Sequence, residues 1–83
     1  MIFSFDNQPP IDTADLTSEE RHVIQKLMAW HSLADSMDFY TAKVQQALNT
    51  GWNHSGPVRP SPELKRIMRH LEETLALKLA PAE

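Results

Sequence analysis

Apolar residues recur about every 3.5 positions between residues 23 and 48 of this chain. The steps alternate between four and three residues, and the positions are Val23, Leu27, Trp30, Ala34, Met37, Thr41, Val44 and Leu48. Only a helix places residues at that spacing on one side. The stripe therefore predicts a long helix that lies against other helices.

Local signals define the two ends of this helix. Thr17 followed by Glu20 matches a capping box, in which the threonine hydroxyl and the glutamate satisfy each other's free backbone N–H groups. Gly51 suits the left-handed residue that closes a helix, and Trp52 follows it, placed to fold back on the last turn. We expect one helix over about 18–50, about 50 Å long at 1.5 Å per residue.

The segment 32–36 is the weak point of this expected helix. Asp35 or Ser36 would serve as the cap of a new helix. The apolar phase runs unbroken across the segment, which favours one continuous helix. A break there would produce a three-helix bundle instead.

A second, shorter helix is expected over about 62–79. Ser61 is a suitable cap, and Pro62 fits the first helical position. Its buried stripe is marked by Leu64, Met68, Leu71, Leu75 and Leu79, with Ile67 alongside. The segment between the helices contains Gly56, Pro57 and Pro60, which is typical of a loop. The fold class is therefore all-α, a helical hairpin with a long and a short helix.

We expect residues 1–16 to form an extended N-terminal arm before a single helical domain over 17–83. Pro9 and Pro10 exclude a helix there. Phe3 and Phe5 nevertheless make the arm apolar, so we expect it to lie on a protein surface.

The unequal helix lengths predict self-association. The shorter helix covers only half of the stripe, and a large exposed apolar patch on a soluble protein normally marks a contact. Either the arm or a second copy must cover the open end. A chain of 83 residues without cysteine has no disulfide staple, and such chains often gain burial by oligomerising. We expect a homodimer or higher homo-oligomer, in a four-helix bundle, with an interface at Val23, Leu27, Trp30, Ala34 and Met37.

Charge is unevenly distributed along the chain. The net charge is −3, but residues 1–20 hold five acidic residues and no base. Residues 51–71 hold Arg59, Lys65, Arg66 and Arg69 against one glutamate. A solvated basic helix face explains this cluster most simply. A nucleic-acid site is the alternative, although the acidic total argues against it.

Catalytic and metal-binding patterns are weak in this sequence. His31 and Asp35 lie four residues apart and would share a helix face, but a metal site in a helical bundle needs several such residues that converge. There is no cysteine nucleophile, and two glycines do not make a phosphate-binding loop. We expect no enzymatic activity, no metal and no cofactor.

The sequence as a whole predicts a small non-enzymatic protein–protein interaction module, an adaptor or regulator that is homodimeric. The candidate partner-binding residues are Trp52, His54, Arg59, Lys65, Arg66, Arg69 and Phe39. Phe39 lies on the far side from the stripe, where the arm's phenylalanines would cover it if no partner does. The alternative function is a dimeric nucleic-acid-binding regulator that uses the cluster at 59–70. No run approaches the roughly 20 apolar residues of a membrane span, so we expect a soluble cytoplasmic protein.

Overall fold

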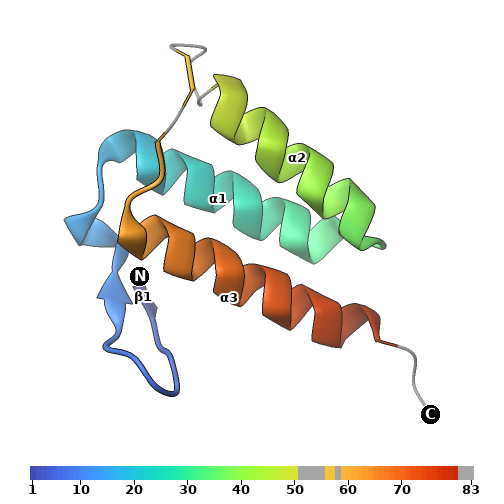
Figure 1. The fold of residues 1–83 in the computed structure, drawn as a ribbon, viewed down its shortest axis with the longest axis horizontal. Coiled ribbons are helices and arrows are strands. Elements are labelled where there is room, and N and C mark those ends of the chain that lie inside the picture. Colours follow the sequence, from blue (N-terminus) through green and yellow to red (C-terminus); the bar gives the residue numbers. More distant parts are fainter. Residues whose placement is uncertain (51–55, 58, 81–83) are drawn as a thin grey trace.

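The computed structural model describes residues 1–50, 56–57 and 59–80. Two short strands, β1 (Ile2–Phe3) and β2 (Ile11–Asp12), precede a 3-10 turn (Thr13–Asp15). Three helices follow, α1 (Ser18–Leu33), α2 (Met37–Thr50) and α3 (Pro62–Leu79). The described part of the chain is therefore mostly helical with one small sheet, and the predicted all-α fold class holds at that level (Figure 1).

The predicted long helix is wrong, because the chain breaks at Ala34–Ser36. α1 closes where the Ala34 N–H donates to the Trp30 carbonyl at 2.7 Å, and Ala34 itself has an extended backbone. α2 then begins beyond Ser36, whose hydroxyl accepts from the Phe39 N–H at 3.2 Å. Serine side chains at such a position satisfy a free N–H group of the new helix, which makes the break favourable.

The other helix starts are confirmed. The Thr17 hydroxyl accepts from the Glu20 N–H at 3.1 Å, and a Glu20 carboxylate oxygen accepts from the Thr17 N–H at 3.3 Å. The Ser61 hydroxyl accepts from the Leu64 N–H at 3.2 Å, with Pro62 in the first turn. The expected closing residue Gly51 lies outside the described residues.

The break changes what covers the apolar stripe. α2 turns back along α1, and α3 packs on both, so the helices share one core (Figure 1). Val23 and Leu27 are fully buried in it, and Ala34 is 5% exposed. Trp30 and Met37 are partly buried against it. The five residues expected at an oligomer interface thus pack within one chain, and the reason for expecting a second copy at this place does not apply.

The N-terminal arm forms a hairpin. β1 and β2 pair in antiparallel register, with Ile2 opposite Asp12 and Phe3 opposite Ile11. Ile11 is 6% exposed and belongs to the core. The hairpin lies beside the first half of α3, on the opposite side of the molecule from α2 (Figure 1).

The hairpin's two phenylalanines do not reach Phe39. The Phe5 and Phe3 rings meet the His70 ring edge-on, with centroids 5.4 and 6.5 Å away. The expectation that the arm covers the Phe39 side of the molecule is therefore wrong. Phe39 stays 36% exposed on α2.

Candidate protein-binding face

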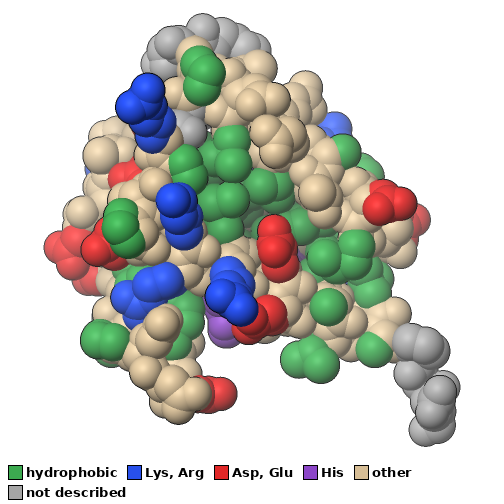
Figure 2. Space-filling view, viewed as in Figure 1, with side chains coloured by type: hydrophobic (Ala, Val, Ile, Leu, Met, Phe, Trp, Pro, Cys, Tyr) green, Lys and Arg blue, Asp and Glu red, His purple; other side chains and the backbone are tan. Residues whose placement is uncertain are grey.

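The basic residues predicted from the sequence gather on one face. Lys65 and Arg69 are exposed on α3, and Arg59 is exposed in the segment that leads to it. Figure 2 shows lysine and arginine side chains over this half of α3 and the preceding chain. Trp52 and His54, the two rings expected to join them, lie outside the described residues.

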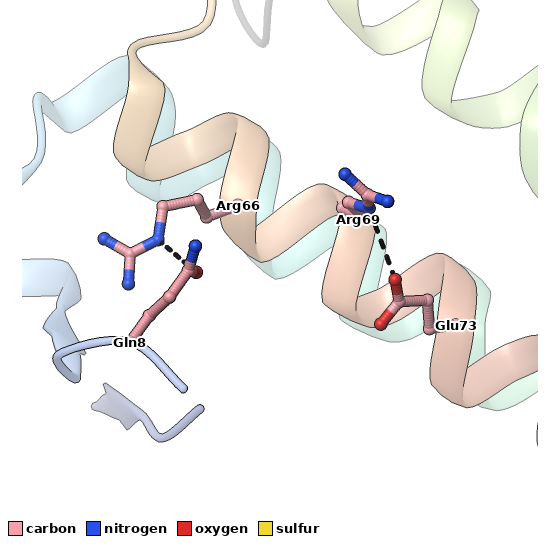
Figure 3. Close-up of polar contacts among 4 residues, drawn as sticks. All are labelled: Gln8, Arg66, Arg69 and Glu73. Atoms are coloured by element: carbon pink, nitrogen blue, oxygen red, sulfur yellow. Dashed lines mark hydrogen bonds and ion pairs between the residues drawn. The ribbon is translucent and has the colours of Figure 1, made fainter. Parts of the chain in front are cut away.

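Arg66 differs from its neighbours because it is half-buried and holds the hairpin. Its Nε donates to the Gln8 side-chain oxygen at 2.8 Å, and Nη2 donates to the Pro9 carbonyl at 2.8 Å (Figure 3). Its guanidinium also lies 4.9 Å from the centroid of the Phe5 ring, within cation–π range. Arg66 is therefore a structural contact rather than a free cation.

Arg69 is available for binding. Its Nε is 3.3 Å from a Glu73 carboxylate oxygen one turn on (Figure 3), but the two side chains are 83% and 65% exposed. Exposed ion pairs at this spacing contribute only about a few tenths of a kcal/mol to stability. A partner's carboxylate would therefore replace Glu73 at little cost.

A recess of about 440 Å³ separates the hairpin loop from α3. Arg66, Arg69 and His70 line it from the helix, together with Asp6 and Glu73. The two arginines and the two acids balance in formal charge. The recess therefore has no net preference for an anion, and we do not assign it a ligand.

Apolar residues of α2 and α3 that are only partly buried pack against the core. They are Met37, Leu48, Met68 and Leu79, and together they are called the apolar strip. Figure 2 shows apolar side chains exposed at the bottom of a hollow between α2 and α3, next to the lysine and arginine side chains. The α2 half of the sequence stripe is thus the part left partly open.

Glu20 fixes the start of α3 and so the position of the basic residues. One carboxylate oxygen caps α1 at Thr17, and the other accepts from the Ser61 N–H at 3.1 Å. Burial alone would raise the pKa of Glu20, but the hydrogen bonds from Ser61 and Thr17 lower it below its usual value. The capping box was visible in the sequence. The link to Ser61, across 41 positions, had no sequence signal.

Tyr40 also escaped the sequence interpretation. It is fully buried, and its hydroxyl has no hydrogen-bond partner within the described part of the chain. Burial, and then the negative charge of Glu72, raise the pKa of Tyr40 to about 12. Tyr40 falls outside the eight-position stripe and carries no motif, so its burial was not predicted from the sequence.

His31 pairs with a residue of α3 and not with Asp35, with which it would share a face in one long helix. Its Nε2 lies 2.9 Å from the Thr74 hydroxyl oxygen, which itself donates to the Leu71 carbonyl. Burial, followed by the charges of Lys78 and His70, lowers the pKa of His31. Across residues 1–50, 56–57 and 59–80, no group of three metal-ligating side chains comes together.

Comparison with known proteins finds no match to a family model, to a curated protein or to a solved structure. None of the described helices has the length and apolar character that crossing a bilayer requires.

Proposed function

We propose that this chain is a non-enzymatic protein–protein interaction module, an adaptor or regulator that binds its partner between α2 and α3. The observation that carries the proposal is the adjacency of exposed Lys65 and Arg69 to the apolar strip on one face (Figure 2). Protein interfaces combine an apolar centre with a polar, charged rim. This face offers both.

The exposed cations of the rim, which lie among the exposed Glu63, Glu72 and Glu73, would pair with acidic residues of a partner. Arg59, Lys65 and Arg69 are exposed near one end of the strip, and the hairpin engages only Arg66. Opposite charges across an interface guide the encounter and fix the register of the partner. The partner's contact segment should therefore be apolar on one side and acidic beside it.

A nucleic-acid partner is the second candidate, supported by the same three exposed cations. The net charge of −3 and the loss of Arg66 to the hairpin both weaken it. Non-specific nucleic-acid binding depends on phosphate neutralisation and falls steeply with added salt.

Peptide display on the intact protein tests the proposal. We expect selected peptides to combine apolar and acidic residues, and their affinity to fall at least about tenfold in a Lys65→Glu, Arg69→Glu double variant. Lys26→Glu, at an exposed position of α1, is the matched control and should leave binding unchanged. Fluorescence anisotropy measures all three proteins, and circular dichroism checks that they fold alike.

Two results would reject the protein-binding proposal. One is a display experiment from which no peptide is enriched. The other is peptide binding that the double variant leaves intact. Salt-sensitive binding of a labelled mixed-sequence duplex, lost in the double variant without any peptide binding, would instead support the nucleic-acid function.

Self-association is a separate prediction, for which we propose a different surface. Leu33 and Leu77 are 75% and 77% exposed. Both lie at the end where α3 meets α1, because the Lys78 Nζ donates to the His31 and Ser32 carbonyls at 3.0 Å. A second copy would cover such exposed leucines.

Sedimentation equilibrium over a range of concentrations tests this surface. We expect a dimer that dissociates when Leu33 and Leu77 are both changed to serine. Ile2→Ser is the matched control, since Ile2 is 63% exposed but lies in β1, at the hairpin. A monomer at every concentration would reject self-association and leave the interaction function standing.

A further inference from the structure

We infer that the segment Ala34–Ser36 is a hinge through which two copies of this chain exchange α2 and α3. In the exchanged dimer, α1, the hinge and α2 form one straight helix in each chain. The α2 and α3 of one copy then pack on the α1 and N-terminal hairpin of the other. The single chain keeps the closed fold described above, and the inference does not depend on the proposed binding function.

The break interrupts the helical hydrogen bonds over a short distance. α1 ends with the bond from the Ala34 N–H to the Trp30 carbonyl, and α2 begins with the bond from the Tyr40 N–H to the Ser36 carbonyl at 3.4 Å. Both join residues four apart, as in an α-helix. A continuous helix adds the five bonds between them, whose donors are the N–H groups of residues 35–39. Residues 33–38 contain neither proline nor glycine, so their side chains permit those bonds.

Side chains satisfy three of the backbone groups that the added bonds would use. The Lys78 Nζ donates to the His31 and Ser32 carbonyls at 3.0 Å. The Ser36 hydroxyl accepts from the Phe39 N–H. In a straight helix these three groups gain backbone partners instead, and the ammonium of Lys78, an exposed residue, returns to water. Straightening therefore leaves none of the three groups unpaired.

The apolar stripe keeps its phase across the hinge. Ala34 is four residues after Trp30 and three before Met37, so all three share one side of a straight helix. In the closed chain, Val23 of α1 and Val44 of α2 belong to one core because α2 turns back along α1. In two straight helices that run in opposite directions, the Val44 of each copy faces the Val23 of the other. The same apolar surface is thus covered in both forms.

The contacts across the hinge can be made equally well between two chains. The Glu20 carboxylate accepts from the Ser61 N–H, and Arg66 donates to the Pro9 carbonyl. In the exchanged dimer each of these hydrogen bonds forms twice, between copies. Exchange of an identical element is a low-cost route to a dimer because it reuses such contacts. Protein concentration and the conformation of the hinge then decide which form is populated.

Hinge variants test the inference by the molar mass of protein refolded from urea over a range of concentrations. Ser36→Ala removes the cap of α2 and favours a continuous helix, so we expect the association constant to rise at least about tenfold. Ser32→Ala, within α1, is the matched control and should change the association constant little.

Asp35→Pro should have the opposite effect. Proline cannot continue a helix, and Ala34 already has the extended backbone that a residue before proline requires. The variant should therefore keep the closed fold, as circular dichroism checks, and lower the association constant at least about tenfold. Asp35→Gly keeps the N–H group and weakens the helix less, so it should change the association constant in the same direction by a smaller factor.

A distance within one chain identifies the straight helix. The chain has no cysteine, so a Lys26→Cys, Gln46→Cys variant takes two nitroxide labels at exposed positions of α1 and α2. The labelled chain is refolded with excess unlabelled chain, so that only the distance within one chain is measured by double electron–electron resonance. Twenty residues of continuous helix place the two backbone positions about 30 Å apart. We expect that distance in the dimer fraction, and a shorter one in the monomer fraction.

Three results would overturn the inference. The first is a monomer at every concentration, in the wild type and in Ser36→Ala. The second is a dimer that Asp35→Pro forms as readily as the wild type, which would point to a contact between closed chains such as the one at Leu33 and Leu77. The third is a dimer fraction whose label distance equals that of the monomer. The peptide-binding function stands in all three cases.

Discussion

Two buried polar side chains differ in whether their polar atoms have hydrogen-bond partners. Glu20 is 7% exposed, and its carboxylate accepts hydrogen bonds from the start of α1 and the start of α3. Tyr40 is fully buried, and within the described residues its hydroxyl has no partner. A buried polar group costs free energy unless it is hydrogen-bonded. The two residues should therefore respond to substitution with opposite signs.

Tyr40→Phe should stabilise the protein. The substitution removes only the unpaired hydroxyl and keeps the ring, which also meets the His31 ring edge-on at 6.2 Å. We expect the free energy of unfolding to rise by about 1 kcal/mol, since an unsatisfied buried group costs about that much or more. Urea unfolding followed by circular dichroism measures the change. An equal or lower midpoint would show that the hydroxyl is in fact paired.

The Tyr40 hydroxyl should also ionise at a higher pH than an ordinary tyrosine does. It is the only tyrosine, so phenolate absorbance reports it alone. Its pKa is raised from 10.0 to about 12, so the folded state favours the protonated form. That stability is fully present below pH 10 and is lost as the pH rises through 12. The folded protein should ionise near the higher value, and the urea-unfolded chain near the lower one.

Glu20→Gln should destabilise the protein. Glutamine keeps one acceptor oxygen but cannot accept at both Thr17 and Ser61, so we expect a loss of about 1–2 kcal/mol in urea unfolding. The pKa of Glu20 is lowered from 4.5. Its contribution is therefore present above that pH and lost as the pH falls through the folded-state pKa. The difference between wild type and variant should vanish in acid.

Glu72→Gln serves as the control for Glu20, because Glu72 is exposed in the middle of α3. It should change the unfolding midpoint little at neutral pH. If both variants lose equal stability, the bridge between the two helix starts is not what Glu20 contributes.

At the level of whole helices, the difference between expectation and structure is confined to three residues. The starts at Thr17 and Ser61 were predictable because the cap and the N–H group it satisfies are three residues apart. The break at Ala34–Ser36 was not, because the stripe keeps its phase across it. Two antiparallel helices that share a core use the same 3.5-residue period as one long helix. Periodicity alone cannot distinguish them.

The candidate protein-binding face, like the helices, could be predicted from the sequence only in part. Sequence places Lys65, Arg66 and Arg69 together, since they lie within five positions of one helix. That Arg66 is the arginine that contacts the hairpin depends on Gln8 and Pro9, which lie 58 and 57 positions before it in the sequence. Likewise, a stripe shows that Met37 and Met68 are apolar but not that they keep exposed surface, because exposure depends on how closely α2 and α3 approach.

Ser36→Ala tests the break. The variant removes the hydroxyl that accepts from the Phe39 N–H and strengthens helix propensity across the turn. We expect a loss of about 1 kcal/mol in urea unfolding, because the start of α2 loses its cap. Ser32→Ala, inside the last turn of α1, is the control and should stabilise slightly or have no effect. If Ser36→Ala also stabilises, another contact determines the break.

For the molecule as a whole, the decisive contact is the one between the N-terminal hairpin and α3. Arg66 makes it with two hydrogen bonds and a ring contact, whereas Arg69, three residues on, makes only an exposed pair with Glu73. The two arginines are thus neighbours in sequence with different roles. One joins the hairpin to the helices, and the other is free to meet a partner.

Comparing Arg66→Ala with Arg69→Ala tests this division of roles. We expect Arg66→Ala to lower the free energy of unfolding by about 1–2 kcal/mol and to speed amide exchange in β1 and β2. Arg69→Ala should change stability by less than about 0.5 kcal/mol, because exposed pairs contribute little, and should instead weaken peptide binding. Arg66→Lys should not restore the loss, since lysine lacks the planar group that reaches Gln8, Pro9 and the Phe5 ring together. Equal losses in the two alanine variants would mean that the hairpin is held by its phenylalanines and Ile11 alone, and that Arg66 is as available to a partner as Arg69.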